Sequence, residues 1–396
     1  MSGHSRIERQ KVKLKFPSNK TLGWLAPLFL IVSIMFMSSN STPMWMDEYV
    51  FYRLSNQLPE YSSTANWILE DRPSLMNASV DWDREEMVKA MNHTYTTPMY
   101  THVPLVPYLV SPIVKGLNKL ADMGKIQHIE DEQGMLPIDP DKKDNYQVNL
   151  NKAELITKIL RCIPILLVSA SLALIFLIAR KKVGNRAYFF CIPVAACVRL
   201  LTGAYFFYWD VFMMFFFVLA LYLAENKPNS KWKYVAACAM VNTKIFVSFL
   251  FLIPLIVKDR KMFWTAFSIV PFWLTTWAVT GDIWYLLRHY FEGTYITDFV
   301  YSLYSLSDFI LLLYSLGILL LFIMVFPILR HWKKYKVYVA LLLVGFLYAF
   351  GCGLGMTHLS TCIYIGALIF PLVVYEFRIA EKLSKWISPK KAVINE

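Results

Sequence analysis

Residues 234–257 read YVAACAMVNTKIFVSFLFLIPLIV, an apolar stretch interrupted near its middle by Asn242, Thr243 and Lys244. Basic clusters flank it on both sides, within 227–233 and 258–261. Because Lys and Arg collect in cytoplasmic loops, both flanks are expected on the cytoplasmic side of a membrane. The charge parity therefore predicts that this stretch enters and returns as two short pieces that turn at Asn242–Lys244. The stretch is also long enough for one ordinary crossing, which is the alternative.

The rest of the chain has the composition of an integral membrane protein. It is 57% hydrophobic and 17% charged. Further apolar stretches long enough to form spans lie at 21–38, 156–179, 187–202, 207–224, 262–280, 307–329, 337–355 and 359–377. We expect an all-α polytopic protein of about ten passes, some short or broken, with both termini cytoplasmic. The net charge of +12 is then assigned to anchoring against anionic lipid, and not to nucleic-acid binding.

This topology divides the chain into five parts. They are a cytoplasmic tail at 1–20, a first span at 21–38, an extracytoplasmic loop at 39–155, a multi-span domain at 156–377 and a second cytoplasmic tail at 378–396. The loop is expected to carry juxtamembrane helices. One is predicted at 43–57, because Thr42 and Pro43 suit an N-cap and first turn. Within 98–110, Pro104 and Pro107 are expected to break any regular helix and to steer the chain back to the membrane.

Two adjacent carboxylates, Asp47 and Glu48, lie on the predicted helix at 43–57. Their side chains are about 100° apart around a helix axis, so they cannot both point into one cleft. One of them is therefore the candidate working group. The alternative is that both are acids favoured by the positive end of the helix dipole.

Two charged groups lie in or beside predicted spans. Asp210 begins the span at 207–224, a few residues after Arg199, and Lys244 lies at the predicted break. Charge at these depths is expensive and is usually paired or functional. One interpretation of Asp210 is that it forms a structural ion pair with Arg199 on an adjacent helix. At a broken span, Lys244 and free backbone N–H groups would form an anion site, whereas in an intact span the lysine would reach towards the interface.

Further polar candidates also fall on the predicted outer side of the membrane: His102, Arg288, His289 and His358. Each alone is uninformative, since a surface histidine is the default interpretation. Together with Asp47, Asp210 and Lys244 they indicate an outward-facing cavity with acids at one edge and cations at another. A lipid-linked phosphate would suit this arrangement, with its tail among the spans and a carboxylate placed to accept a proton from an acceptor hydroxyl.

The order of these motifs resembles the GT-C superfamily of polyprenyl-phosphate-sugar glycosyltransferases, in particular the protein O-mannosyltransferases and aminoarabinose transferases. The matching elements are Asp47-Glu48 after the first span, the segment His102–Leu105, Asp210 at the head of a later span, Thr243-Lys244 in a broken span, and HLSTCIYIGALIFPL at 358–372. The resemblance implies an inverting transfer with Asp47 as base or acceptor orienter and cationic residues on the donor phosphate. The family's double proline appears here as Val103-Pro104, and we expect no large C-terminal soluble domain like those of the oligosaccharyltransferases.

Several alternatives stay open at this point. A transporter or flippase of a lipid-linked or anionic solute would also use a broken span and an intramembrane lysine, although no internal repeat is visible. A non-enzymatic membrane scaffold would be indifferent to loss of Asp47. Some GT-C members use a divalent metal and others do not, and we expect no cofactor or metal here. The implied partners are the polyprenyl-phosphate sugar and a glycan, lipid or protein acceptor, in a prokaryotic plasma membrane or the endoplasmic reticulum.

Overall fold

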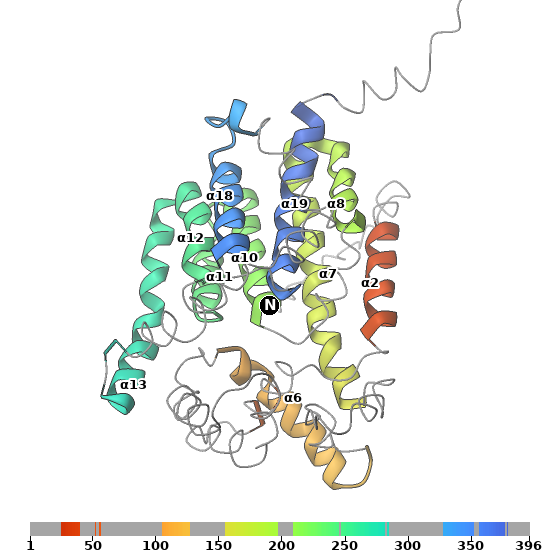
Figure 1. The fold of residues 1–396 in the computed structure, drawn as a ribbon, viewed down its shortest axis with the longest axis vertical. Coiled ribbons are helices and arrows are strands. Elements are labelled where there is room, and N and C mark those ends of the chain that lie inside the picture. The colour runs from red at the N-terminus through yellow and green to blue at the C-terminus, as the bar shows by residue number, and fades with distance from the viewer. Residues whose placement is uncertain are drawn as a thin grey trace, which may run out of the picture.

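The computed structural model describes a helical protein (Figure 1). The residues it describes are 25–39, 52, 55–56, 105–126, 155–196, 209–244, 247–281, 283–284, 328–351, 356–376 and 378. Their helices are α2 (Leu25–Ser39), α6 (Leu105–Asp122), α7 (Leu155–Val183), η5 (Gly184–Phe190), α8 (Cys191–Ala196), α10 (Trp209–Asn226), α11 (Trp232–Val241), α12 (Val247–Lys258), η6 (Arg260–Ile269), α13 (Val270–Thr280), α18 (Lys336–Gly351) and α19 (Met356–Glu376). No strand occurs in these ranges, which confirms the predicted all-helical class.

Among the described residues, two helical stretches are long and apolar enough to cross a membrane, Leu155–Val194 and Trp209–Asn226. Shorter apolar helices accompany them at 232–241, 247–258, 336–345 and 364–376. The span predicted at 187–202 differs in form, because η5 is a 3-10 helix and α8 has six residues. Gly184, at a φ of 60°, ends α7 in the left-handed conformation and separates it from this piece. Most of the span predicted at 307–329 lies outside the described residues, and the number of passes stays a prediction.

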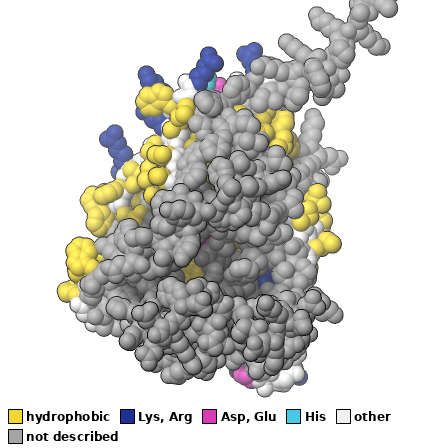
Figure 2. Space-filling model, in the orientation of Figure 1, with side chains coloured by type: hydrophobic (Ala, Val, Ile, Leu, Met, Phe, Trp, Pro, Cys, Tyr) yellow, Lys and Arg dark blue, Asp and Glu magenta, His cyan; other side chains and the backbone are white. Residues whose placement is uncertain are grey.

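Ion pairs at one end of the bundle fix the directions of its helices. Lys182 Nζ of α7 lies 3.2 Å from Glu225 Oε2 of α10, and Lys258 Nζ of α12 lies 3.0 Å from the same atom. The C-terminal ends of α7, α10 and α12 therefore meet at one end, which we call the basic end. Figure 2 shows Lys and Arg side chains along this edge and hydrophobic side chains down the flanks.

The main core lies between α7, α10, α12, α18 and α19. Large side chains fill it without reaching solvent, among them Phe176, Phe190, Phe217 and Phe251. Phe217 of α10 and Phe251 of α12 pack edge to face, with ring centroids 5.3 Å apart. The core therefore places the last turns of α7, α10 and α12 side by side at the basic end. A second hydrophobic cluster, described below with α6, lies at the opposite end.

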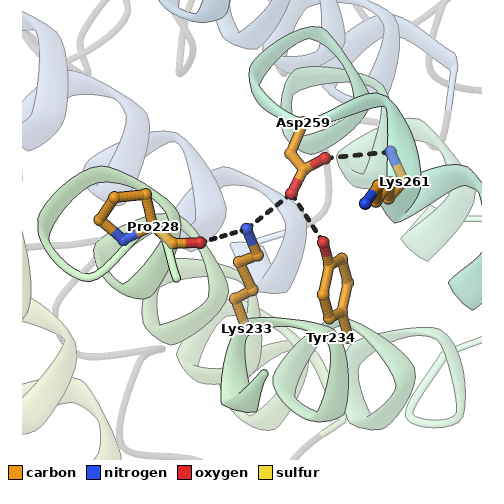
Figure 3. A network of polar contacts seen from close by, with 5 residues as sticks. All are labelled: Pro228, Lys233, Tyr234, Asp259 and Lys261. Atoms are coloured by element: carbon orange, nitrogen blue, oxygen red, sulfur yellow. Dashed lines mark hydrogen bonds and ion pairs between the residues drawn. The ribbon is translucent and has the colours of Figure 1, made fainter. Parts of the chain in front are cut away.

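The predicted break near Asn242–Lys244 is confirmed. Helix α11 ends at Val241 and α12 begins at Val247. Lys233 Nζ, at the start of α11, lies 2.7 Å from Asp259 Oδ2, directly after α12 (Figure 3). The two helices thus form a hairpin that starts and finishes at the basic end. At 1.5 Å per residue, α11 is about 15 Å long, roughly half the thickness of a bilayer core.

Helix α6 packs across the end opposite the basic end (Figure 1). Its apolar face, from Val106 to Ala121, joins Ile156 and Leu160 of α7 and Trp209 of α10 in a separate hydrophobic cluster. The expectation that Pro107 breaks a helix is wrong, because α6 begins at Leu105 and contains it. Pro107 lies in the first helical turn, where backbone N–H groups have no intrahelical acceptor to lose.

Candidate functional site

The interruption between α11 and α12 is a polar structure built inside an apolar hairpin. Asn242 N and Nδ2 donate to Cys238 O at 3.0 and 2.9 Å. Thr243 Oγ1 donates to Ala239 O at 2.7 Å, and its N–H donates to Met240 O at 3.1 Å. Ser248 Oγ donates to Val241 O at 3.4 Å. The last four carbonyls of α11 therefore all have partners, which allows a helix to end among apolar neighbours.

Asn242 also ties the break to the next helical segment. Its Nδ2 donates to Ser268 Oγ of η6 at 2.8 Å, so one side chain links the end of α11 to η6. An amide carries two N–H donors, and both are used here. The position of the break is thus fixed from within the hairpin and from η6.

Lys244 follows this polar turn and pairs with Asp210. Its Nζ lies 2.8 Å from Asp210 Oδ2 and 3.0 Å from Oδ1. The Asp210 side chain is 2% exposed and that of Lys244 is 11% exposed. Asp210 also lies in the first turn of α10, where the helix dipole favours a carboxylate. In this structure the negative charge beside Lys244 is therefore the Asp210 carboxylate.

The depth of this pair follows from α10. Asp210 and Glu225 lie in the first and last turns of the same helix. At 1.5 Å per residue they are separated by about 22 Å along the axis. Since Glu225 lies at the basic end, the Lys244–Asp210 pair lies well towards the opposite end of the bundle, which α6 covers.

Two buried groups near this pair were not predicted from the sequence. Tyr364 of α19 is buried, its hydroxyl has no hydrogen-bond partner among the described residues, and the charge of Asp210 acts on it. Arg161 of α7 is completely buried. Its neighbour Leu160 belongs to the same hydrophobic cluster as Trp209, which precedes Asp210. The half of the bundle away from the basic end therefore contains a second buried cation, which was not recognised in the apolar stretch 156–179.

The other predicted site residues divide into two groups. His358 is in the first turn of α19, six positions before Tyr364. The following lie outside the described residues: Asp47, Glu48, His102, Arg199, Arg288 and His289. Asp210 was predicted either to pair with Arg199 or to serve a functional site. In the structure its ion-pair partner is Lys244, and Arg199 lies outside the described residues. Lys244 and Asp210 are thus the predicted site residues that the structure brings together.

The segment predicted as a helix at 43–57 is described at Tyr52, Ser55 and Asn56. Tyr52 is helical and buried, and its hydroxyl donates to Asn118 Oδ1 of α6. Tyr52 packs in the same cluster as Trp209 of α10. This part of the loop therefore lies at the same end of the bundle as Asp210.

The base of the hairpin has its own polar network, away from the break (Figure 3). Asp259 accepts from Tyr234 Oη at 3.0 Å and from the Lys261 N–H at 3.1 Å, in addition to its pair with Lys233. Burial acts to raise the pKa of Asp259, but the hydrogen bonds from Lys233, Lys261 and Tyr234 outweigh it and lower that pKa. The hydrogen bond with Asp259 raises the pKa of Lys233. This network clamps the two ends of the hairpin together.

Within the described ranges, no group of three or more His, Cys, Asp or Glu side chains is arranged to hold a metal ion. The expectation about metal dependence therefore stays a prediction. No protein-family model, curated protein or solved structure matches the chain. The likeness to the GT-C superfamily accordingly depends on the order of short sequence motifs and on the topology that they imply.

Proposed function

We propose that the chain is a multi-pass membrane glycosyltransferase that moves a sugar from a polyprenyl monophosphate donor to an acceptor on the extracytoplasmic side. The membrane would be a prokaryotic plasma membrane or the endoplasmic reticulum. The observation that carries the proposal is the polar break in the α11–α12 hairpin, which holds Lys244 against Asp210 at depth. A permanently buried charge pair is a poor source of stability, so its presence in an apolar bundle calls for a functional reason.

In this proposal Lys244 receives the donor phosphate. Asp210 keeps the ammonium charged and oriented in the absence of donor, because a buried lysine without a counter-ion would favour its neutral form. When the phosphate arrives, it competes with the carboxylate for Lys244, and Asp210 keeps the stabilisation of the α10 N-terminus. Arg161, buried in the same half of the bundle, is a second candidate cation for the phosphate.

The chemistry requires one proton acceptor and one leaving group. The acceptor hydroxyl attacks the anomeric carbon, and its proton passes to a carboxylate, for which Asp47 or Glu48 is proposed. The bond from carbon to the phosphate oxygen breaks on the opposite face, and the electron pair leaves with the polyprenyl phosphate. The configuration is inverted. Tyr52, which follows the two carboxylates closely in sequence, packs beside the start of α10, in support of this arrangement.

The α11–α12 hairpin also favours a second candidate, a transporter or flippase of a lipid-linked anion. Discontinuous helices with a charged residue at the break are typical binding elements of transporters. Such a protein would need Lys244 and Asp210 but would transfer no sugar and would not depend on Asp47. The two candidates therefore differ in the product formed and in their response to Asp47→Asn.

The deciding experiment measures sugar transfer by the purified full chain from a panel of radiolabelled polyprenyl-phosphate sugars to protein, lipid and glycan acceptors. Wild type is compared with Asp47→Asn, Lys244→Gln and the control Lys231→Gln, which removes an exposed positive charge at the basic end. We expect Asp47→Asn to lose turnover by at least about 100-fold with donor binding retained, since general-base catalysis contributes 10²–10⁴-fold. Lys244→Gln should weaken donor binding, and Lys231→Gln should behave as wild type.

Absence of turnover with every donor, or full activity in Asp47→Asn, would overturn the transferase. Donor binding or translocation in reconstituted vesicles without turnover, lost in Lys244→Gln, would instead support the transporter. If neither Asp47→Asn nor Lys244→Gln changes sugar transfer, donor binding or translocation, a non-enzymatic scaffold is the remaining function.

A further inference from the structure

Glu225 at the basic end is surrounded by lysines from two other helices. Its side chain is 6% exposed and lies 3.2 Å from Lys182 Nζ and 3.0 Å from Lys258 Nζ. The Lys181 ammonium donates to the main-chain carbonyl of Glu225. Two ammonium groups therefore face the carboxylate and a third binds the main chain of the same residue, so the cluster carries an excess of positive charge. The two ammonium groups on the carboxylate remain accessible, with side chains 28% and 31% exposed for Lys182 and Lys258.

Hydrogen-bond donors are also in excess here. Lys182 lies over the ring of Tyr338, with its Nζ 5.4 Å from the ring centroid, and Glu225 acts electrostatically on the same tyrosine. The Tyr338 hydroxyl is buried and has no hydrogen-bond partner among the described residues. Asn226 Nδ2, on the residue after Glu225, is equally buried and unpartnered within the same ranges. Buried polar groups normally have partners, so these two groups are able to hydrogen-bond to a ligand at this cluster.

Apolar side chains lead away from this cluster along two neighbouring helices. On α12, Ile253 and Val257 are exposed one turn apart and immediately precede Lys258. On α18, Leu343 and Leu347 are exposed one turn apart, on the same face as the exposed Lys336 at the start of that helix. Figure 2 shows such hydrophobic side chains down the flanks, with Lys and Arg at the edge above them. Cations above an apolar face are the complement of an anionic amphiphile.

We propose that Lys182, Lys258 and Tyr338 bind the phosphate group of an anionic phospholipid whose acyl chains lie along α12 and α18. The phosphate oxygens would accept from the two ammonium groups in competition with Glu225, and charge-assisted bonds of this kind are the strong ones. The anionic leaflet attracts basic segments at the cytoplasmic surface, which suits the predicted sidedness of this end. This inference depends on the membrane location proposed above and is independent of the transferase chemistry.

The test is thermal unfolding of the purified full chain in uncharged detergent micelles containing phosphatidylglycerol or, in parallel, phosphatidylcholine at the same mole fraction. A ligand that binds the folded state selectively raises the melting temperature, and near-saturating phosphatidylglycerol should give a rise of roughly 3 °C. Phosphatidylcholine and inorganic phosphate should give much smaller rises. The double variant Lys182→Gln/Lys258→Gln should lose most of the phosphatidylglycerol effect.

The matched control is Lys227→Gln/Lys231→Gln, which removes the same charge from exposed positions at the same end. It should keep the full phosphatidylglycerol effect. Glu225→Gln removes the competing carboxylate and should enlarge the effect. Tyr338→Phe removes one hydroxyl, should reduce the effect by about half, and serves as the test if the double lysine variant does not fold.

Three results would overturn the proposal. The first is a wild-type response in the double lysine variant or in Tyr338→Phe. The second is an equal loss of response in the control variant, which would show a diffuse attraction of lipid to positive charge. The third is an equal rise with inorganic phosphate, which would make the occupant a free anion.

Discussion

Replacing Asp210 by Asn is expected to destabilise the protein strongly, because it leaves Lys244 buried without its counter-ion. The magnitude can be bounded from the two outcomes open to the lysine. If the ammonium keeps its charge, breaking a buried pair costs about 3–5 kcal/mol. If it loses its proton, the cost at pH 7.4 is that of deprotonating an amine of pKa about 10.4, or roughly 4 kcal/mol. The two routes agree at about 4 kcal/mol.

The second route also predicts how the cost depends on pH. The unfolded state holds a proton that the folded variant lacks, so the stability of Asp210→Asn should increase with pH relative to wild type. At pH 9 the penalty should fall to about 2 kcal/mol. The assay is thermal unfolding of both proteins in detergent at the two pH values, with a melting-temperature loss of roughly 5 °C expected at pH 7.4.

The double variant Asp210→Asn/Lys244→Gln provides the control for this argument. Its two neutral amides can still hydrogen-bond, so it should recover most of the lost stability, to within about 1–2 kcal/mol of wild type. A double variant as unstable as Asp210→Asn would refute the reasoning. A cost for Asp210→Asn below about 1 kcal/mol would do so as well, because it would mean that Lys244 reaches water.

Three further changes test other parts of the structure by the same unfolding assay. Thr243→Val should cost about 1–3 kcal/mol, since it leaves a half-buried helix carbonyl without a donor. Thr275→Val on an exposed face should change stability by less than about 0.5 kcal/mol. Equal effects of the two would contradict the role given to the break. Tyr234→Phe should cost about 1 kcal/mol at neutral pH. The lowered pKa of Asp259 means that its stabilisation is present above about pH 4 and is lost as the pH falls further, so Tyr234→Phe and wild type should converge there. Arg161→Gln removes hydrogen-bond donors of a fully buried guanidinium and should cost about 1–3 kcal/mol, and a near-zero effect would show that the guanidinium is not held in the interior.

The broken hairpin could be predicted from the sequence because it follows from a one-dimensional rule. Basic residues before and after 234–257 had to lie on one side, and the polar residues Asn242–Lys244 marked the turn. Pro107 was misjudged because a proline was taken as a helix breaker without regard to its place in the first turn.

The distribution of basic residues could not predict the Lys244–Asp210 pair or the burial of Arg161. The pair joins residues from separate helices, and only the packing of α10 against the hairpin brings them within hydrogen-bonding distance. A search for opposite charges at similar predicted depth could have proposed it. Arg161 gave no comparable signal, because a single arginine near the end of an apolar stretch normally extends to the interface.

The order in which the pair is synthesised has a consequence for how the protein is assembled. Asp210 and Lys244 are 34 residues apart. At about 5–20 residues per second, the lysine leaves the ribosome roughly 2–7 s after the aspartate. During this interval α10 carries an uncompensated carboxylate, and α11 and α12 are each too short to insert as independent spans. In a membrane, α10 and the hairpin would therefore have to enter as one unit, which makes residues 209–258 the smallest segment of this region expected to insert without its neighbours.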